Sequence, residues 1–176
     1  MLRGFSGYGC KWISANPAKD VSLKLYIPSK SKSSTLGDLV EYNSRVVLKD
    51  DDAVFCGNCN TKRAHSSSRD YTSDLCLIEV IRVSQINETF WVKNSLPINF
   101  PVRDLKLPGF TRTYRVLATC HHRGSLQTGH WFTKISTNSG WYELDDLKVK
   151  SLSTKPPGLY DQTVVVLLLA AEDNFR

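Results

Sequence analysis

The sequence predicts an α+β fold that is mostly antiparallel β-sheet, and three observations support this prediction. Short segments of alternating or continuous apolar residues recur along the chain, separated by turns rich in Gly, Pro, Asn and Asp. A single short helix is predicted, at residues 36–40. Residues 164–169 form a continuous apolar run, which is typical of a strand covered on both faces. One helix among many turn-connected strands indicates a largely antiparallel sheet.

Length and composition are those of a single-domain globular protein. The chain has 176 residues, of which 41% are hydrophobic and 23% charged, so one domain with a sizeable core is expected. The net charge is +6, and the basic residues are scattered along the sequence. They form no basic stripe interleaved with aromatic residues, the pattern that favours nucleic-acid binding. The longest apolar run, residues 164–171, is far shorter than the roughly 20 residues that span a bilayer. We therefore expect no nucleic-acid and no membrane partner.

The expected localisation is intracellular, in the cytoplasm or the nucleus. Arg3, Gly4 and Ser6 interrupt any apolar segment at the start of the sequence, so no signal peptide is predicted. The five cysteines are an odd number at irregular spacing, which argues against a disulfide framework. A reducing compartment agrees with both observations.

Residues 1–18 are rich in Gly and aromatic residues and show no clear period. Residues 21–27 alternate apolar and polar side chains, which predicts a half-buried strand. Thr35, with Asp38 three residues later, is a start signal for the helix at residues 36–40. Further predicted strands lie at residues 75–83, 96–100, 130–136 and 141–144, and another begins at Tyr114.

Cys56 and Cys59 have the spacing of half a zinc site. Cys-x-x-Cys on a tight turn presents two thiolates from one knuckle to a structural zinc ion. A tetrahedral site needs further ligands, and the candidates are Cys10, His65 and Cys76, although Cys76 opens an apolar strand and is expected in the core. The alternative is that Cys56 and Cys59 are two buried cysteines in a turn. The metal hypothesis is therefore a structural zinc ion held by Cys56 and Cys59, with Cys10, His65 and Cys76 as the candidate further ligands.

Residues 114–146 carry the pattern on which the functional prediction depends. They contain three of the four histidines and end in two adjacent carboxylates, Asp145 and Asp146. If the turn between two predicted strands spans residues 137–140, His130 lies on the same sheet face as Asp145, one diagonal step away. Such neighbours are about 7–8 Å apart at their Cα atoms. A turn one residue longer or shorter would offer Asp146 instead.

A His–Asp pair of this kind can transfer protons. An aspartate hydrogen-bonded to one ring nitrogen of His130 fixes its tautomer and supports the imidazolium, which leaves the other nitrogen for proton transfer. The alternative is a surface hairpin in which the two side chains have no chemical role.

Four short motifs add a family resemblance. The chain contains Tyr114-Arg-Val-Leu, then His122-Arg-Gly, Gly129-His-Trp and Trp141-Tyr-Glu-Leu-Asp-Asp. In this order they resemble the closing motifs of the ubiquitin-specific proteases, the papain-like deubiquitinating cysteine peptidases. Cys56-Gly-Asn-Cys resembles the second zinc knuckle of that family's fingers, and residues 77–82 resemble its strand ending in Arg-Phe, with Val83 in place of Phe.

The resemblance implies a single partial catalytic domain over residues 1–176. A fingers-like region with degenerate zinc knuckles would occupy about residues 1–75, and the palm with the His/Asp motif about residues 76–176. The implied fold is the palm and fingers of a papain-like peptidase without its N-terminal thumb.

The implied chemistry is thiol-dependent hydrolysis of ubiquitin isopeptide bonds, which requires no cofactor. The implied partners are ubiquitin, or a ubiquitin-like modifier, and ubiquitinated proteins. His130 would be the general base, Asp145 would orient it, and Asp146 would assist the site. The loop at residues 124–128 would border the channel for the ubiquitin tail, with the contributing residues Gly124, Ser125, Gly129 and Trp131.

One departure from the family pattern bears on activity. The N-terminal box that carries the family's nucleophilic cysteine is absent, and Cys10 lacks both its Asn-Thr approach and a following helical pattern. We therefore expect this chain to be inactive by itself. It is a fragment or incomplete gene model of an active deubiquitinase, a pseudoenzyme that binds ubiquitin without cleaving it, or a scaffold domain. The presence of both His130 and Asp145 favours the first over the last.

Overall fold

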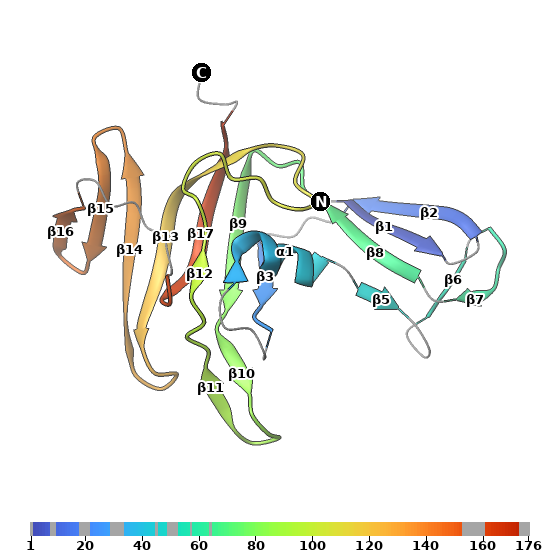
Figure 1. The fold of residues 1–176 in the computed structure, drawn as a ribbon, viewed down its shortest axis with the longest axis horizontal. Helices are drawn as coiled ribbons and strands as arrows, with labels where there is room; N and C mark the ends of the chain where they lie inside the picture. The colour runs from blue at the N-terminus through green and yellow to red at the C-terminus, as the bar shows by residue number, and fades with distance from the viewer. Residues whose placement is uncertain are drawn as a thin grey trace.

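A seven-stranded sheet forms the body of the molecule in the computed structural model (Figure 1), with the strand order β16-β15-β14-β13-β17-β9-β3. The strands are β3 (Leu23–Tyr26), β9 (Leu75–Ile81), β13 (Tyr114–Gly124), β14 (Gly129–Thr137), β15 (Gly140–Asp145), β16 (Lys148–Ser151) and β17 (Val164–Ala171). All neighbours are antiparallel except β3 and β9, which are parallel. The prediction of a strand-rich, largely antiparallel fold with one helix is confirmed for the residues that the structure describes, which are 2–7, 10–17, 22–28, 34–44, 46–48, 53–56, 58–63, 65–152 and 161–172.

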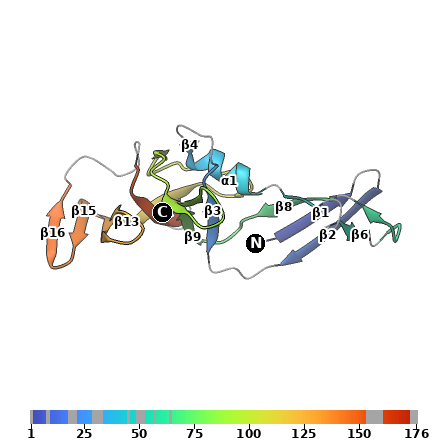
Figure 2. The same cartoon turned by 90° about the horizontal axis from the view of Figure 1, so that it is seen from below.

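A separate four-stranded sheet lies at the end of the molecule opposite β16 (Figures 1 and 2). Its order is β2-β1-β8-β5, and its strands are β1 (Leu2–Gly7), β2 (Cys10–Pro17), β5 (Val46–Leu48) and β8 (His65–Asp70). We predicted no element in residues 1–18, and the β1–β2 ladder corrects this. Backbone hydrogen bonds hold the ladder, and they require no alternation of side chains.

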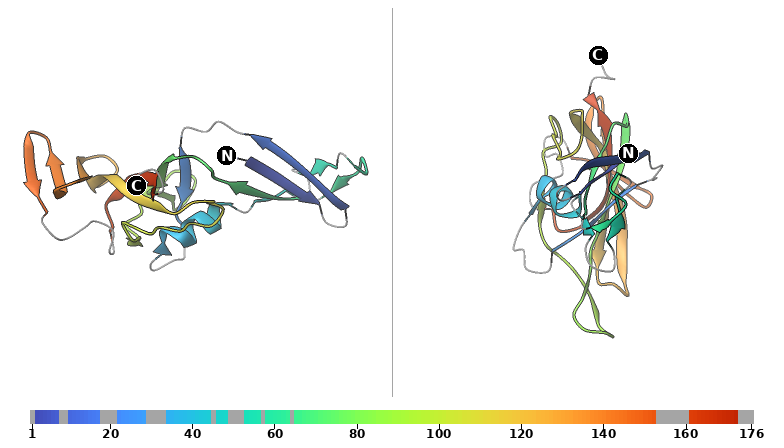
Figure 3. Two further views of the ribbon diagram at one scale, coloured as in Figure 1. Left: turned by 90° about the horizontal axis from the view of Figure 1, so that it is seen from above. Right: turned by 90° about the vertical axis from the view of Figure 1, so that its right-hand side faces the viewer.

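Three two-stranded pairs complete the sheets. They join β6 (Val54–Phe55) to β7 (Lys62–Arg63), β10 (Val83–Gln85) to β11 (Trp91–Lys93), and β4 (Ser34–Thr35) to β12 (Ile98–Asn99). The β10–β11 hairpin projects from the main sheet, as both Figure 1 and the side view in Figure 3 show. The strand predicted at residues 96–100 is reduced to β12, because the prolines at 97 and 101 have no N–H to donate to a ladder.

The helix α1 (Leu36–Ser44) begins at the predicted position and extends four residues beyond the predicted end. The Thr35 N–H donates to Asp38 Oδ2 over 2.9 Å, and the Asp38 N–H donates to Thr35 Oγ1 over 3.0 Å, which together form a capping box. The backbone hydrogen bond from Thr35, followed by its side chain, holds the pKa of Asp38 below its usual value. None of the described residues forms a helix long and apolar enough to cross a membrane.

The hydrophobic core lies on one face of the seven-stranded sheet. Its buried members come from the strands, from α1 and from the segment between β12 and β13, and include Leu25, Leu39, Ile78, Phe100, Leu107, Tyr114, Val116 and Leu169. The predicted strand at residues 164–169 is β17, where no residue is exposed, although Val165, Val166 and Leu168 are half-buried. Because successive residues of a strand face opposite sides of the sheet, burial of one face fixes which side chains of β13 and β14 lie on the side of the candidate site.

Candidate functional site

The β14–β15 hairpin has the register that the sequence predicts. Thr137 pairs with Gly140, Ser136 with Trp141, and Thr133 with Leu144. Continuing this register by one pair sets Phe132 opposite Asp145. His130 and Phe132 are two residues apart, so both lie on the sheet face that carries Asp145.

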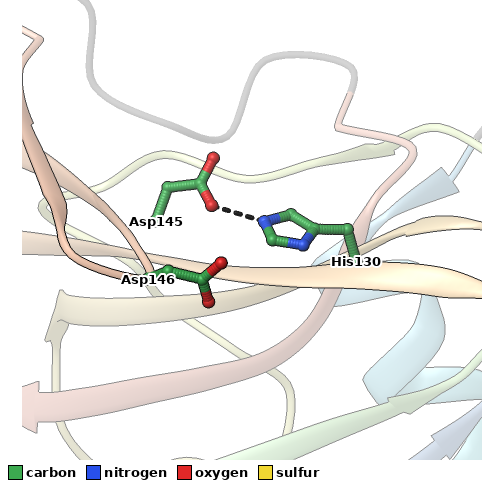
Figure 4. Close-up of side chains that lie close together, drawn as sticks. All are labelled: His130, Asp145 and Asp146. Carbon is green, nitrogen blue, oxygen red and sulfur yellow. Dashed lines mark hydrogen bonds and ion pairs between the residues drawn. The ribbon is translucent and has the colours of Figure 1, made fainter.

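His130 and Asp145 are in direct contact. Nε2 of the imidazole is hydrogen-bonded to Oδ1 of Asp145, and the imidazole and carboxylate come from adjacent strands (Figure 4). The side chains are 45% and 36% exposed, so both are accessible to a reacting group. Because Asp145 accepts from Nε2, the other ring nitrogen, Nδ1, is the one available for proton transfer.

Asp146 lies beside this pair in the two-residue turn between β15 and β16. Its φ is 51°, and the turn is closed by the pairing of Asp145 with Lys148. One ligand atom from each of His130, Asp145 and Asp146 lies within 4.8 Å of the others. The three residues predicted for catalysis are therefore adjacent, and Asp145 is the carboxylate hydrogen-bonded to the imidazole.

The Cys56–Cys59 turn is a tight knuckle, as predicted. The Asn60 N–H donates to the Cys56 carbonyl over 2.8 Å, and Asn60 has a φ of 49°. Cys56 is buried, whereas Cys59 is exposed with its Sγ 3.0 Å from Thr61 Oγ1.

The zinc hypothesis gains no further ligand from the side chains that the structure describes. Within that part of the chain, the one group of three potential metal ligands is His130, Asp145 and Asp146. Cys10 begins β2, but its side chain and that of His65 lie outside the described set. Cys76 is half-buried against the core, and burial raises the pKa of its thiol to about 11, which disfavours the thiolate form that zinc needs. A zinc ion at Cys10, Cys56 and Cys59 stays a prediction.

The loop at residues 124–128 is a compact turn centred on Ser125. The Ser125 N–H donates to the Thr128 carbonyl over 2.8 Å, and Ser125 Oγ accepts from the N–H groups of Gln127 and Thr128. Gly124 has a φ of 114°, and a Cβ there would lie 2.5 Å from the Thr128 carbonyl oxygen. Glycine is thus required where the turn begins.

Lys93 ties this loop to the β10–β11 hairpin. Its Nζ donates to the carbonyls of His122 and Gly124 over 2.7 and 2.8 Å and lies 3.0 Å from His122 Nδ1. Burial and the Lys93 charge together lower the pKa of His122. Trp131 packs on His122, with ring centroids 4.6 Å apart, so its indole lies on the face opposite His130.

We expect Gly129→Ala to lower the free energy of unfolding by about 1–3 kcal/mol, the usual cost of overpacking. A Cβ at this position would lie 2.6 Å from the Arg123 carbonyl oxygen and against the His122 ring. Urea unfolding checks this. Gly37→Ala is the matched control, because its Cβ would meet nothing closer than 3.6 Å. Equal effects of the two substitutions would contradict the tight packing of Gly129 against Arg123 and His122.

Sequence reasoning missed a buried polar network next to the site. His121 and Arg82 are buried, and His121 Nδ1 lies 3.4 Å from Asp161 Oδ2. Arg82 donates to the Asp161 carbonyl over 3.1 Å. A histidine inside an apolar strand pattern was the available signal, but its partner lies 40 positions further along the chain.

Comparison with known proteins identifies the family. The family model described as "Ubiquitin carboxyl-terminal hydrolase" matches residues 40–168, well over half of the chain. The chain belongs to the ubiquitin carboxyl-terminal hydrolase family. This confirms the resemblance to deubiquitinating proteases that the four motifs predicted, and the matched range includes His130, Asp145 and the Cys56 knuckle.

The matches to individual relatives cover a smaller part of the chain than the family model does. The chain is similar to proteins named ubiquitin carboxyl-terminal hydrolase 21 from Rattus norvegicus, Bos taurus and Homo sapiens. Each is 25% identical to it over 114 residues, which are 60% of this chain and 20% of the relative. The matched segment thus spans a fifth of each relative. As a member of the ubiquitin carboxyl-terminal hydrolase family, the chain carries a domain of the deubiquitinase type.

Proposed function

We propose that this chain supplies the general base and its orienting carboxylate to a cysteine-type deubiquitinase site, and binds the carboxyl-terminal tail of ubiquitin or a ubiquitin-like modifier. The observation that carries the proposal is the hydrogen bond from His130 Nε2 to Asp145, which leaves Nδ1 as the proton acceptor. Ubiquitinated proteins would be the substrates. In this scheme the seven-stranded sheet is the palm, and the four-stranded sheet with the β6–β7 knuckle is the fingers.

The chemistry assigned to the pair is proton transfer to and from a thiol. His130 Nδ1 takes the proton of a cysteine thiol, and the thiolate attacks the carbonyl carbon of the isopeptide bond. The imidazolium then gives its proton to the leaving lysine amine, so the bond between carbonyl carbon and nitrogen breaks and a thioester remains. Water, deprotonated by the same imidazole, hydrolyses the thioester. Asp145 stabilises the imidazolium between these steps.

Cys120 of β13 does not supply this thiol in the proposed site. Cys120 pairs with Thr133, one position out of phase with His130, and therefore faces the other side of the sheet. Cys10 begins strand β2 of the four-stranded sheet rather than a helix. A helix N-terminus is one of the usual means of stabilising a thiolate. The placements of Cys120 and Cys10 favour, as the second candidate function, a domain that binds ubiquitin without cleaving it.

Ubiquitin binding is the first test of the proposal. We expect isotopically labelled chain to bind ubiquitin, and to bind ubiquitin lacking its terminal Gly-Gly at least about tenfold more weakly, equivalent to about 1.4 kcal/mol. Gly124→Ala is expected to weaken binding of intact ubiquitin, whereas Gly37→Ala serves as a distant control. Equal affinity for intact and truncated ubiquitin would contradict the assignment of the loop at residues 124–128 to the tail.

Reaction with ubiquitin that carries a thiol-reactive group at its C-terminus is the second test. We expect no covalent adduct with this chain alone. An adduct at Cys10, located by mass spectrometry, would overturn the proposal that the thiol comes from elsewhere. A separate polypeptide that supplies the thiol is expected to restore labelling with the unsubstituted chain but not with His130→Ala. This result would distinguish a catalytic role of His130 from ubiquitin binding alone.

A further inference from the structure

A second, fully buried histidine lies on the same sheet face as His130. His121 is the direct cross-strand partner of Phe132, and its side chain is 0% exposed. We propose that the buried His121–Asp161 pair positions the catalytic His130–Asp145 pair, acting through the ring of Phe132. This inference rests on the proposed function, because it assigns His121 and Asp161 as positioning residues of that site.

Both ring nitrogens of His121 have hydrogen-bond partners. Nε2 lies 2.8 Å from Thr119 Oγ1, and Nδ1 lies 3.0 Å from Thr163 Oγ1. The Thr163 hydroxyl donates its single proton to Asp161 Oδ1 over 3.0 Å, so it must accept from His121 Nδ1. Nδ1 of His121 therefore carries a proton, and it also faces Asp161 Oδ2 at 3.4 Å.

Asp161 is itself held by backbone groups. Its Oδ1 accepts from the N–H groups of Thr163 and Val164, each over 2.8 Å. Burial opposes ionisation of Asp161, but hydrogen bonding and charge from His121, with those two N–H groups, keep its pKa well below the usual range. The carboxylate that orients His121 is thus fixed to the start of β17.

The imidazole of His121, held by these hydrogen bonds, packs against the ring of Phe132. The two rings are stacked, with centroids 4.8 Å apart and planes 10° from parallel. A ring bonded at both nitrogens cannot rotate freely about χ2, so it holds the plane of Phe132 more firmly than an aliphatic side chain would. Phe132 is 5% exposed, and the Arg123 and Lys134 cations lie 4.7 and 5.7 Å from its centroid.

Phe132 adjoins both catalytic side chains. It follows His130 by one same-face step along β14, and continuing the β14–β15 register by one pair sets it opposite Asp145. Arg123, whose guanidinium lies over the Phe132 ring, is also the cross-strand partner of His130. A change in the plane of Phe132 would therefore alter the space in which the His130 imidazole meets the Asp145 carboxylate.

The test uses His121→Phe, which keeps an aromatic ring against Phe132 and removes both nitrogen contacts. The readout is the tautomer of His130, measured by ¹⁵N NMR of the ring at alkaline pH, where imidazoles are neutral. In the unsubstituted chain we expect the form with the proton on Nε2 to dominate, since Asp145 accepts there. In His121→Phe we expect the ratio of this form to the Nδ1-protonated form to fall about tenfold, equivalent to about 1.4 kcal/mol.

Two further variants keep the test decisive. Leu39→Ala destabilises the same core from α1 and is expected to leave the His130 tautomer ratio unchanged. Thr163→Val removes one hydroxyl at nearly constant volume and is measured in place of His121→Phe if that variant does not fold; a smaller shift in the same direction is expected. An unchanged tautomer ratio in the folded variant would overturn the positioning role. Failure to bind ubiquitin would count against the proposed function and would leave this measurement unaffected.

Discussion

Replacing Arg82 with methionine is expected to lower the free energy of unfolding by about 3–5 kcal/mol, the usual cost of removing one member of a buried charged network. Arg82 is 4% exposed and joins the end of β9 to two other segments through four hydrogen bonds. Its guanidinium donates to the carbonyls of Asn94, Leu96, Asp161 and Val164 over 2.6–3.1 Å. Methionine fills a similar volume but removes the guanidinium donor from all four carbonyls, of which the Asp161 carbonyl keeps the Ile98 N–H as a donor.

Urea unfolding followed by circular dichroism measures this loss. Burial lowers the pKa of Arg82 to about 10, while the Asp161 charge opposes that shift, so the guanidinium stays charged at neutral pH. Arg103→Met is the matched control: Arg103 is exposed, and a change within about 0.5 kcal/mol is expected. A loss below about 1 kcal/mol for Arg82→Met would mean that water or rearranged backbone replaces the guanidinium.

The parts of this fold that the sequence predicts are those specified by local chemistry. The capping box of Thr35 and Asp38 places the start of α1, because both partners lie within four residues. The alternation of Leu23 to Tyr26 places β3 with its apolar side chains buried. The turn residues before Gly140 fix the parity of the β14–β15 hairpin, and through it the contact of His130 with Asp145.

The missed parts depend on pairing between distant segments. Strand β1 pairs with β8, more than 50 positions away, and its Gly- and Ser-containing sequence has no period to reveal it. In β13, an irregular register between Val116 and Ala118 changes which residues face the core. The alternation read from Tyr114 therefore does not predict that His121 is buried.

The residues of the candidate site likewise fall into those that local spacing predicts and those that depend on pairing between distant strands. His130, Asp145 and Asp146 come from one hairpin and its following turn, so spacing alone was enough to group them. Asp161 lies outside every motif and reaches His121 because β17 pairs with β13. A thiol partner for His130 and further ligands for the proposed zinc site cannot be derived from spacing, because such groups would come from segments whose position only tertiary structure defines.

The second large effect is expected for Asp161→Asn, which should lower the free energy of unfolding by about 3 kcal/mol at neutral pH. The folded-state pKa of Asp161 lies below its ordinary value of about 3.9. A lowered folded pKa stabilises the protein above the unfolded pKa, and this stabilisation is lost as the pH falls below about 4. The difference between unsubstituted chain and variant should therefore be full at pH 7 and shrink steadily in acid.

Unfolding free energies measured in urea between neutral and strongly acidic pH check this sign. Asp38→Asn is the matched control, because the pKa of Asp38 is also lowered, but at an exposed helix cap, where the pH-dependent difference should be much smaller. If Asp161→Asn keeps the full acid dependence of the unsubstituted chain, another carboxylate carries it. In that event the hydrogen bonds to Asp161, rather than its charge, would account for how firmly His121 and the stacked Phe132 are held beside His130.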